Sequence, residues 1–226
     1  MNRLLQSSLL SQFLNIEHGF STKSTPLQEL QGINIVFPTQ KHGTAVIFID
    51  LANRNREFIA DGLLTGTPGI AVGVRTADCV PILLYEPSAQ IVGAVHAGWK
   101  GTRGRIIEHA VRYIIDHGGR AERLIAAFGP SIGMCCYSVP EDRANQFISV
   151  FGEDPQMVAG IEGEPHLNLA YGNFKQLTNK GVLREHIDYR FYCTSCDHER
   201  FVSFRRDGNT DKKNEIVSFI SLSKEQ

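Results

Sequence analysis

Residues 77–101 read ADCVPILLYEPSAQIVGAVHAGWKG and contain two apolar runs separated by a turn signal. The runs, residues 80–85 and 91–95, have the length and β-branched content of buried strands. Cys79 comes directly before the first run and His96 directly after the second. In an antiparallel pair, the start of one strand lies beside the end of the other. The sequence therefore predicts that this thiol and this imidazole share one edge of a sheet.

The rest of the chain mixes short apolar runs with amphipathic segments, and no repeat or linker divides it. We expect further strands at residues 33–37, 45–49, 61–65, 69–74, 124–128, 191–193, 203–206 and 216–220. The turn at residues 67–69 suggests that 61–65 and 69–74 form a second hairpin. We expect helices at residues 102–117, 141–151 and 167–181, the last with Asn168 as its N-cap.

This order of elements predicts one domain covering residues 1–226. Its class is α+β or mixed α/β, with a mixed, largely antiparallel sheet and flanking helices.

Composition excludes several classes of function. The chain has 226 residues, a formal net charge of -1 and 42% hydrophobic residues, so it carries no basic footprint for nucleic acid. The apolar runs are shorter than the roughly 20 residues that span a bilayer, so no membrane partner is expected. An odd count of 5 cysteines, two of them adjacent, argues against a disulfide framework. A reducing, cytoplasmic location is therefore expected.

A catalytic zinc site takes three protein ligands from His, Cys and carboxylate side chains. Cys79 and His96 are two candidates, and His42 is the best third candidate because its Gln-Lys-His-Gly-Thr loop directly precedes a strand. Spacing alone does not decide the matter, because no two of these residues lie within one helical turn or one CxxC motif. A free cysteine is usually a small buried hydrophobe. His18 and His166 lie in polar or turn contexts and are expected at the surface.

The residues after His96 suggest an anion site. Gly98 allows close approach of the backbone to a ligand, and Trp99, Lys100 and Arg103 follow at the expected start of a helix. The plainer alternative is a strand-to-helix turn whose basic side chains are solvated.

Cys193 and Cys196 have CxxC spacing, which is typical of a redox pair or of half a zinc knuckle. The sequence holds no second CxxC, and the context is not that of thioredoxin. A structural or incidental role is therefore favoured. Burial is the expectation for the adjacent Cys135 and Cys136.

Three motifs resemble one known family. They are ADCxP at residues 77–81, VHAGWKGT at 95–102 and GPxIGxxCYxV at 129–139, supported by HGFST at 18–22, QxHG at 40–43, ADGLLT at 60–65 and FRRDG at 204–208. The chain resembles the YfiH-type laccase-domain family, whose members are described as purine nucleoside phosphorylases and as polyphenol oxidases. The resemblance implies the fold shared by that family and the cytotoxic necrotising factor.

The resemblance also implies zinc ligands at His42, Cys79 and His96. The implied reaction is phosphorolysis of adenosine, inosine, guanosine or methylthioadenosine to the base and ribose 1-phosphate, with adenosine deamination as a side activity. Cys79 and His96 would be catalytic, with Asp61 and Asp78 as candidate carboxylates for proton transfer.

The nucleoside and phosphate would be bound by the residues that follow His96, namely Gly98, Trp99, Lys100 and Arg103. The chain departs from the family in two places. The SLNLG-like segment near the N-terminus is missing. Lys100 stands where Arg is common, so a single ammonium group replaces a guanidinium that can make two parallel hydrogen bonds to an anion.

Three alternatives stay open. The site could bind copper and oxidise phenols, since His and Cys ligands hold copper more tightly than zinc. Cys79 could be the nucleophile of a cysteine hydrolase with His96 as its base. The chain could also be a non-enzymatic binding module. The oligomeric state, monomer or dimer, is left undecided.

Overall fold

The computed structural model describes residues 4–26, 30, 32–190, 192–208 and 215–224. It contains a six-stranded sheet with the order β11-β8-β6-β7-β4-β3, a four-stranded sheet with the order β1-β12-β5-β2, and a separate β9–β10 hairpin. The strands are β1 (Ile16–Phe20), β2 (Ile35–Val36), β3 (Val46–Ile49), β4 (Gly62–Thr65), β5 (Ala71–Thr76), β6 (Val80–Glu86), β7 (Ile91–Ala97), β8 (Ile125–Phe128), β9 (Val158–Ile161), β10 (Glu164–Leu167), β11 (Ile187–Asp188) and β12 (Ile216–Leu222).

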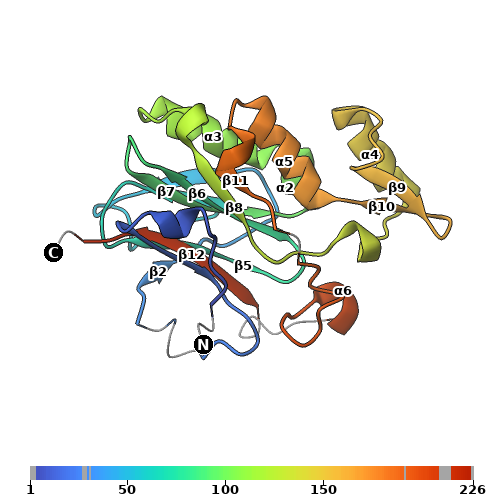
Figure 1. The fold of residues 1–226 in the computed structure, drawn as a ribbon, viewed down its shortest axis with the longest axis horizontal. Helices are drawn as coiled ribbons and strands as arrows, with labels where there is room; N and C mark the ends of the chain where they lie inside the picture. The colour runs from blue at the N-terminus through green and yellow to red at the C-terminus, as the bar shows by residue number, and fades with distance from the viewer. Residues whose placement is uncertain (1–3, 27–29, 31, 191, 209–214, 225–226) are drawn as a thin grey trace.

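The helices are α2 (Trp99–Arg103), α3 (Ile106–Asp116), α4 (Glu141–Phe151), α5 (Leu169–Asn179) and α6 (Phe204–Asp207), with 3-10 turns η1 (Leu10–Gln12), η2 (Ala121–Arg123), η3 (Met134–Cys136) and η4 (Arg184–His186). Helices α2, α3 and α5 cover one face of the six-stranded sheet, and the four-stranded sheet lies against the other face (Figure 1). Helix α4 packs beside the β9–β10 hairpin, and α6 lies apart from this helical layer. The expected α+β class, with a mixed, largely antiparallel sheet and flanking helices, is confirmed.

The centre of the large sheet is the hairpin of β6 and β7, as the sequence of residues 77–101 predicts. The two strands pair antiparallel, with Val80 opposite Ala97 and Pro81 opposite His96. Every residue of both strands is buried. Along β6, Ile82 and Leu84 contact the helices, whereas Leu83 and Tyr85 contact the second sheet. Both faces of the hairpin are therefore covered, which explains why its strands read as continuous apolar runs instead of alternating ones.

The prediction of a second hairpin, formed by residues 61–65 and 69–74, is wrong. Residues 62–65 and 71–76 are both strands, but β4 pairs with β3 and β7 in the large sheet, whereas β5 pairs with β12 and β2 in the other sheet. The turn between them carries the chain from one sheet to the other. Local turn residues indicate a change of direction, but burial of each strand's apolar faces decides which neighbour it pairs with.

One helix prediction and one strand prediction also need correction. The segment expected as one helix over 102–117 is divided into α2 and α3, because Arg105 takes a left-handed φ of 64° between them. Residues 203–206, expected as a strand, begin the short helix α6. Ser203 is its N-cap, because its side-chain oxygen accepts the N–H of Arg206.

Other expectations agree with the structure. Helix α4 has the expected bounds, and the Asn168 side chain caps α5 by accepting the N–H of Tyr171. Cys193 forms an isolated bridge with Ser131, but residue 191 of that expected strand lies outside the described residues. Within the described part of the chain, no helix is long and apolar enough to cross a membrane.

The expectation that His18 and His166 lie at the surface is wrong. Both are buried, and each makes a backbone hydrogen bond that a core histidine needs. Nε2 of His18 accepts the N–H of Ser7, and Nδ1 of His166 lies 2.6 Å from the carbonyl oxygen of Met134. These two imidazoles are packing elements.

Candidate metal centre

Three of the predicted site residues come together at one edge of the large sheet. The ligand atoms of His42, Cys79 and His96 all lie within 4.8 Å of one another. The two imidazole rings meet edge to face, with their centroids 4.7 Å apart. His96 is buried, Cys79 is partly buried and His42 is exposed. The cluster therefore runs from the core to the surface, so that a small molecule can reach it.

Sheet topology explains the convergence. Strands β3 and β4 are parallel, and β4 is antiparallel to β7, which is antiparallel to β6. The starts of β3, β4 and β6 therefore lie at the same edge as the end of β7. His42 lies in the loop before β3 and Cys79 directly precedes β6, whereas His96 is the next-to-last residue of β7, at that same edge. Sequence spacing alone does not show that the β3 loop reaches this edge.

Two residues of this edge have left-handed backbone conformations. His42 has a φ of 58°, and Asp78, directly before Cys79, has a φ of 88°. Such conformations are unfavourable for residues other than glycine, and they persist where surrounding contacts impose them. Here they turn the backbone sharply just where the imidazole and the thiol must point toward the same place.

Asp61, at the start of β4, supports His96 and the His42 loop together. Its carboxylate accepts the backbone N–H groups of His42 at 2.8 Å and Gly43 at 2.7 Å. It also lies 2.8 Å from Nδ1 of His96 and is only 1% exposed. A carboxylate at Nδ1 fixes the imidazole so that Nε2 faces the ligand side, as in metal centres where a carboxylate holds a metal-binding histidine. We therefore interpret Asp61 as a positioning residue.

The charges within the cluster favour a thiolate. Burial raises the pKa of a thiol, but the charge of His96 and hydrogen bonds from both imidazoles outweigh it and lower the pKa of Cys79 to about 6. Burial would lower the pKa of His96, but the Cys79 thiolate and Asp61 raise it to about 9. Burial likewise opposes ionisation of Asp61, yet hydrogen bonds from His96 and Gly43 keep its pKa below the ordinary value. One thiolate and two imidazoles form a donor set that suits zinc or copper.

Gly98 leaves the space in which the three side chains meet. A Cβ atom at this position would lie 2.9 Å from Cδ2 of His42 and 3.1 Å from Sγ of Cys79. The backbone itself, with φ of -73° and ψ of 176°, is accessible to any residue. Gly98 was expected to approach a ligand, and the structure shows that it makes room for the ligating side chains.

Replacing Gly98 by alanine is therefore expected to weaken metal binding by about 5- to 150-fold, because overpacking of this size costs about 1–3 kcal/mol. Metal affinity measured by competition with a chromophoric chelator checks this. Gly160→Ala is the matched control, because a Cβ there meets nothing within 4 Å. Equal affinities of the two variants would contradict the prediction.

Asp78 is engaged elsewhere. Its carboxylate accepts the hydroxyl of Thr194 at 2.6 Å and the backbone N–H of Arg205 at 2.6 Å. Its main-chain carbonyl accepts the N–H of Ile132. Both carboxylate oxygens thus bind the segment that includes α6. A role in proton transfer stays a prediction, whereas the contacts make Asp78 the link between that segment and Cys79.

The side chains of Trp99, Lys100 and Arg103, which were expected to bind substrate, belong to α2, and this helix begins directly after Gly98. Trp99 is partly buried, and the side chains of Lys100, Arg103 and Arg143 lie over its ring, Arg143 the nearest at 4.3 Å. Arg103 is held by Gln146 of α4. Arg143 is a residue that sequence reasoning missed.

Tyr137 and Arg205 lie next to these side chains, and we call the group Trp99, Lys100, Tyr137, Arg143 and Arg205 the wall beside the ligands. The guanidinium of Arg205 lies 5.1 Å from the centre of the Tyr137 ring. Burial raises the pKa of the Tyr137 phenol, against the opposing charges of Arg143 and Arg205, so this side chain keeps its proton at neutral pH. Both residues lie in motifs that resemble the family, at 129–139 and 204–208, and those motifs were the available signal.

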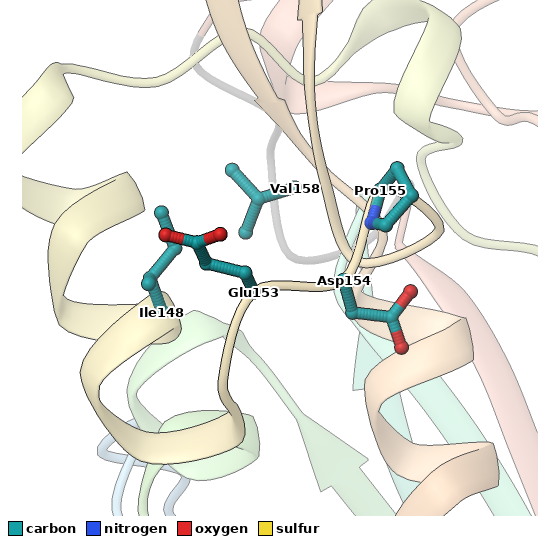
Figure 2. Close-up of a pocket in the computed structure, with 5 residues that line it drawn as sticks. All are labelled: Ile148, Glu153, Asp154, Pro155 and Val158. Carbon is teal, nitrogen blue, oxygen red and sulfur yellow. The ribbon is translucent and has the colours of Figure 1, made fainter.

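A surface hollow elsewhere is not part of this centre. It measures about 270 Å³ and is lined by Ile148, Glu153, Asp154, Pro155 and Val158 (Figure 2). The Glu153 and Asp154 carboxylates point away from each other in that view. Asp154 instead forms an ion pair with Lys175 at 2.8 Å. The hollow therefore lacks the converging polar groups of a binding site.

Known proteins share both the sequence and the fold. A purine nucleoside phosphorylase of Deinococcus radiodurans is 41% identical over 170 residues, which are 74% of this chain and 63% of that protein. The matched region is thus less than two thirds of that relative's length. The adenosine deaminase RL5 of an unknown prokaryotic organism is 35% identical over 185 residues, which are 77% of this chain and 71% of that protein.

The crystal structure of the hypothetical protein YfiH of Bacillus licheniformis has a TM-score of 0.83 and 25% identity, covering 99% of this chain and 100% of that one. The family model described as multi-copper polyphenol oxidoreductase laccase matches residues 22–222. The chain therefore belongs to this laccase-domain, YfiH-type family.

Proposed function

We propose that this protein is a zinc-dependent purine nucleoside enzyme. It cleaves adenosine, inosine, guanosine or methylthioadenosine with phosphate to the free base and ribose 1-phosphate, and it deaminates adenosine as a side reaction. The observation that carries this proposal is the convergence of His42, Cys79 and His96, with Asp61 behind His96. The relatives named purine nucleoside phosphorylase and adenosine deaminase support it.

When bound, zinc would supply Lewis-acid chemistry at an oxygen atom, which suits phosphate activation as well as deamination. The protein's own residues do the rest. His42, Cys79 and His96 would hold the ion, and Asp61 accepts the Nδ1 proton of His96, which would leave the Nε2 lone pair for the metal.

The wall beside the ligands would bind the substrate. Trp99 would offer an aromatic surface for a purine, and the protonated phenol of Tyr137 is available as a hydrogen-bond donor. Lys100, Arg143 and Arg205 supply positive charge for phosphate, with the arginines suited to bidentate contacts. Holding phosphate against the ribose carbon would lower the barrier mainly through orientation.

A cysteine hydrolase is the second candidate, and one observation favours it. The lowered pKa of Cys79 and the raised pKa of His96 describe a thiolate–imidazolium pair, which is the resting state of a cysteine nucleophile and its base. The same pair would give up the imidazolium proton when a metal ion binds. Alkylation separates the two cases, because a metal ion would protect the Cys79 thiolate.

Elemental analysis of the purified protein, followed by incubation with adenosine, tests the proposal. With phosphate, adenine and ribose 1-phosphate are expected; without phosphate, inosine is expected. Loss of both products after chelation, and their recovery on adding zinc, would support the zinc assignment. If zinc-loaded protein forms neither product but copper-loaded protein oxidises a phenol, the proposal fails and polyphenol oxidation replaces it.

A further inference from the structure

A second cluster of ligating side chains lies outside the candidate metal centre. Cys135 and Cys136 of turn η3 meet Cys193 and Cys196, and the four Sγ atoms all lie within 4.8 Å of one another. Sγ of Cys196 is 3.6 Å from Sγ of Cys135 and 3.4 Å from Sγ of Cys136. Residues some 60 positions apart in the sequence thus bring all their thiols to one point.

These separations match a metal tetrathiolate better than disulfides. A disulfide needs sulfur atoms about 2.05 Å apart. Four sulfurs bound tetrahedrally at about 2.3 Å from zinc are about 3.8 Å from one another. The observed distances lie near the second value.

The backbone around Cys193 stabilises a thiolate. Gly133 donates its N–H to Sγ of Cys193 at 3.3 Å, and the N–H groups of Ser195 and Cys196 act in the same way. Burial opposes ionisation of Cys193, but these hydrogen bonds outweigh it and lower its pKa.

Positive charge also lies close by. Nη1 of Arg206 donates to the carbonyl oxygens of Thr194 and Ser195, the two residues inside the CxxC turn. The Arg206 guanidinium is thereby fixed beside the thiols. A zinc ion with four thiolates carries two net negative charges, and a fixed arginine offsets part of this charge.

We propose that Cys135, Cys136, Cys193 and Cys196 bind a structural zinc ion. Binding forms four Zn–S bonds and releases to solvent one proton from each cysteine that is still a thiol, without oxidation or reduction. A closed, four-sulfur site is the structural type of zinc centre, unlike the three-ligand site at His42, Cys79 and His96. The sequence shows only half of it, because the adjacent cysteines at 135 and 136 do not have CxxC spacing.

The position of this zinc site gives it a role. Tyr137 follows Cys136 directly, and Thr194 lies inside the CxxC turn and binds Asp78. Arg205 also binds Asp78 and packs on Tyr137. The ion would therefore join the two segments that form the wall beside Cys79. It would position that wall and would not touch the substrate.

Zinc analysis of a Cys79→Ala/His96→Ala double variant tests the proposal independently of the catalytic metal. This variant lacks the first site, so about one zinc ion per chain should remain, held against dialysis with a weak chelator. A third substitution, Cys196→Ser, should remove that ion. Ser195→Ala is the matched control inside the same turn and should keep it. A double variant that is folded by circular dichroism but retains no zinc would overturn the proposal.

Cobalt supplies a second readout, which can also be recorded on the unsubstituted protein. Cobalt-loaded full-length protein should show the intense visible bands and the sulfur-to-metal charge transfer of a tetrathiolate, and these signals should persist in the double variant. Intact mass under denaturing, non-reducing conditions gives the alternative outcome. If the freshly isolated protein carries disulfides among these cysteines and takes up no cobalt there, the cluster is a redox pair and the proposal is wrong.

Discussion

Replacing Cys79 by alanine is expected to remove the metal ion from the candidate centre and to lower kcat for adenosine phosphorolysis by more than about 100-fold. Loss of a residue that only supports a metal ligand typically costs about 10–100-fold, so loss of a ligand itself should exceed that range. His42 and His96 would remain, but two imidazoles are too few for a catalytic zinc site. Elemental analysis and initial rates with adenosine and phosphate measure the two effects.

A second substitution separates the metal role of Cys79 from a nucleophilic one. Cys79→Asp supplies a carboxylate that can bind zinc but cannot act as a thiolate nucleophile, so some metal and measurable turnover should return. His198→Ala is the control, since this imidazole is exposed and lies outside the cluster. Full zinc content and full turnover in the Cys79→Ala protein would refute the metal role.

Replacing Asp61 by asparagine is expected to weaken metal binding about 10–100-fold, although Asp61 is not itself a proposed ligand. The amide cannot accept at every site that the carboxylate fills. Asp61 accepts the N–H groups of Lys41, His42 and Gly43 and also holds Nδ1 of His96. An NH₂ group in this place meets N–H donors, so one or more of them loses its acceptor. The His42 loop and the His96 ring would both lose their fixed positions.

The same change should destabilise the metal-free protein by about 1–3 kcal/mol, the cost of a buried donor left without a partner. Urea unfolding in the presence of a chelator measures this term, and chelator competition measures metal affinity. Asp154→Asn is the matched control, because that carboxylate binds Lys175 away from the centre and should leave metal affinity unchanged. An Asp61→Asn protein with unaltered metal affinity would show that the carboxylate does not position His96.

The central hairpin and two of the three proposed ligands could be predicted from local sequence patterns. Residues 80–85 and 91–95 are apolar without interruption because both faces of β6 and β7 are buried. Such runs can be recognised from the local sequence alone. Antiparallel pairing of the two strands, with Pro81 opposite His96, then places Cys79 beside His96. The caps of helices are also local, so Asn168 could be assigned in advance.

Pairing between distant strands is not a local property, and there the sequence was insufficient. The turn at 67–69 suggested a hairpin, whereas β4 and β5 enter different sheets because each buries its side chains against a different neighbour. The long-range hydrogen-bond partners of a side chain likewise cannot be predicted from the local sequence. Asp61 and Asp78 looked alike as carboxylates near the site, but one holds His96 and the other holds Thr194 and Arg205.

Three features became visible only in the folded chain: His42 reaches the same sheet edge, Gly98 makes room for the ligands, and four cysteines from two distant segments meet. Each of these facts depends on atoms that approach across the fold after long stretches of intervening chain. Sequence specifies which side chains can ligate a metal ion. Packing of the two sheets and their helices specifies which of them lie within a few ångströms of one another.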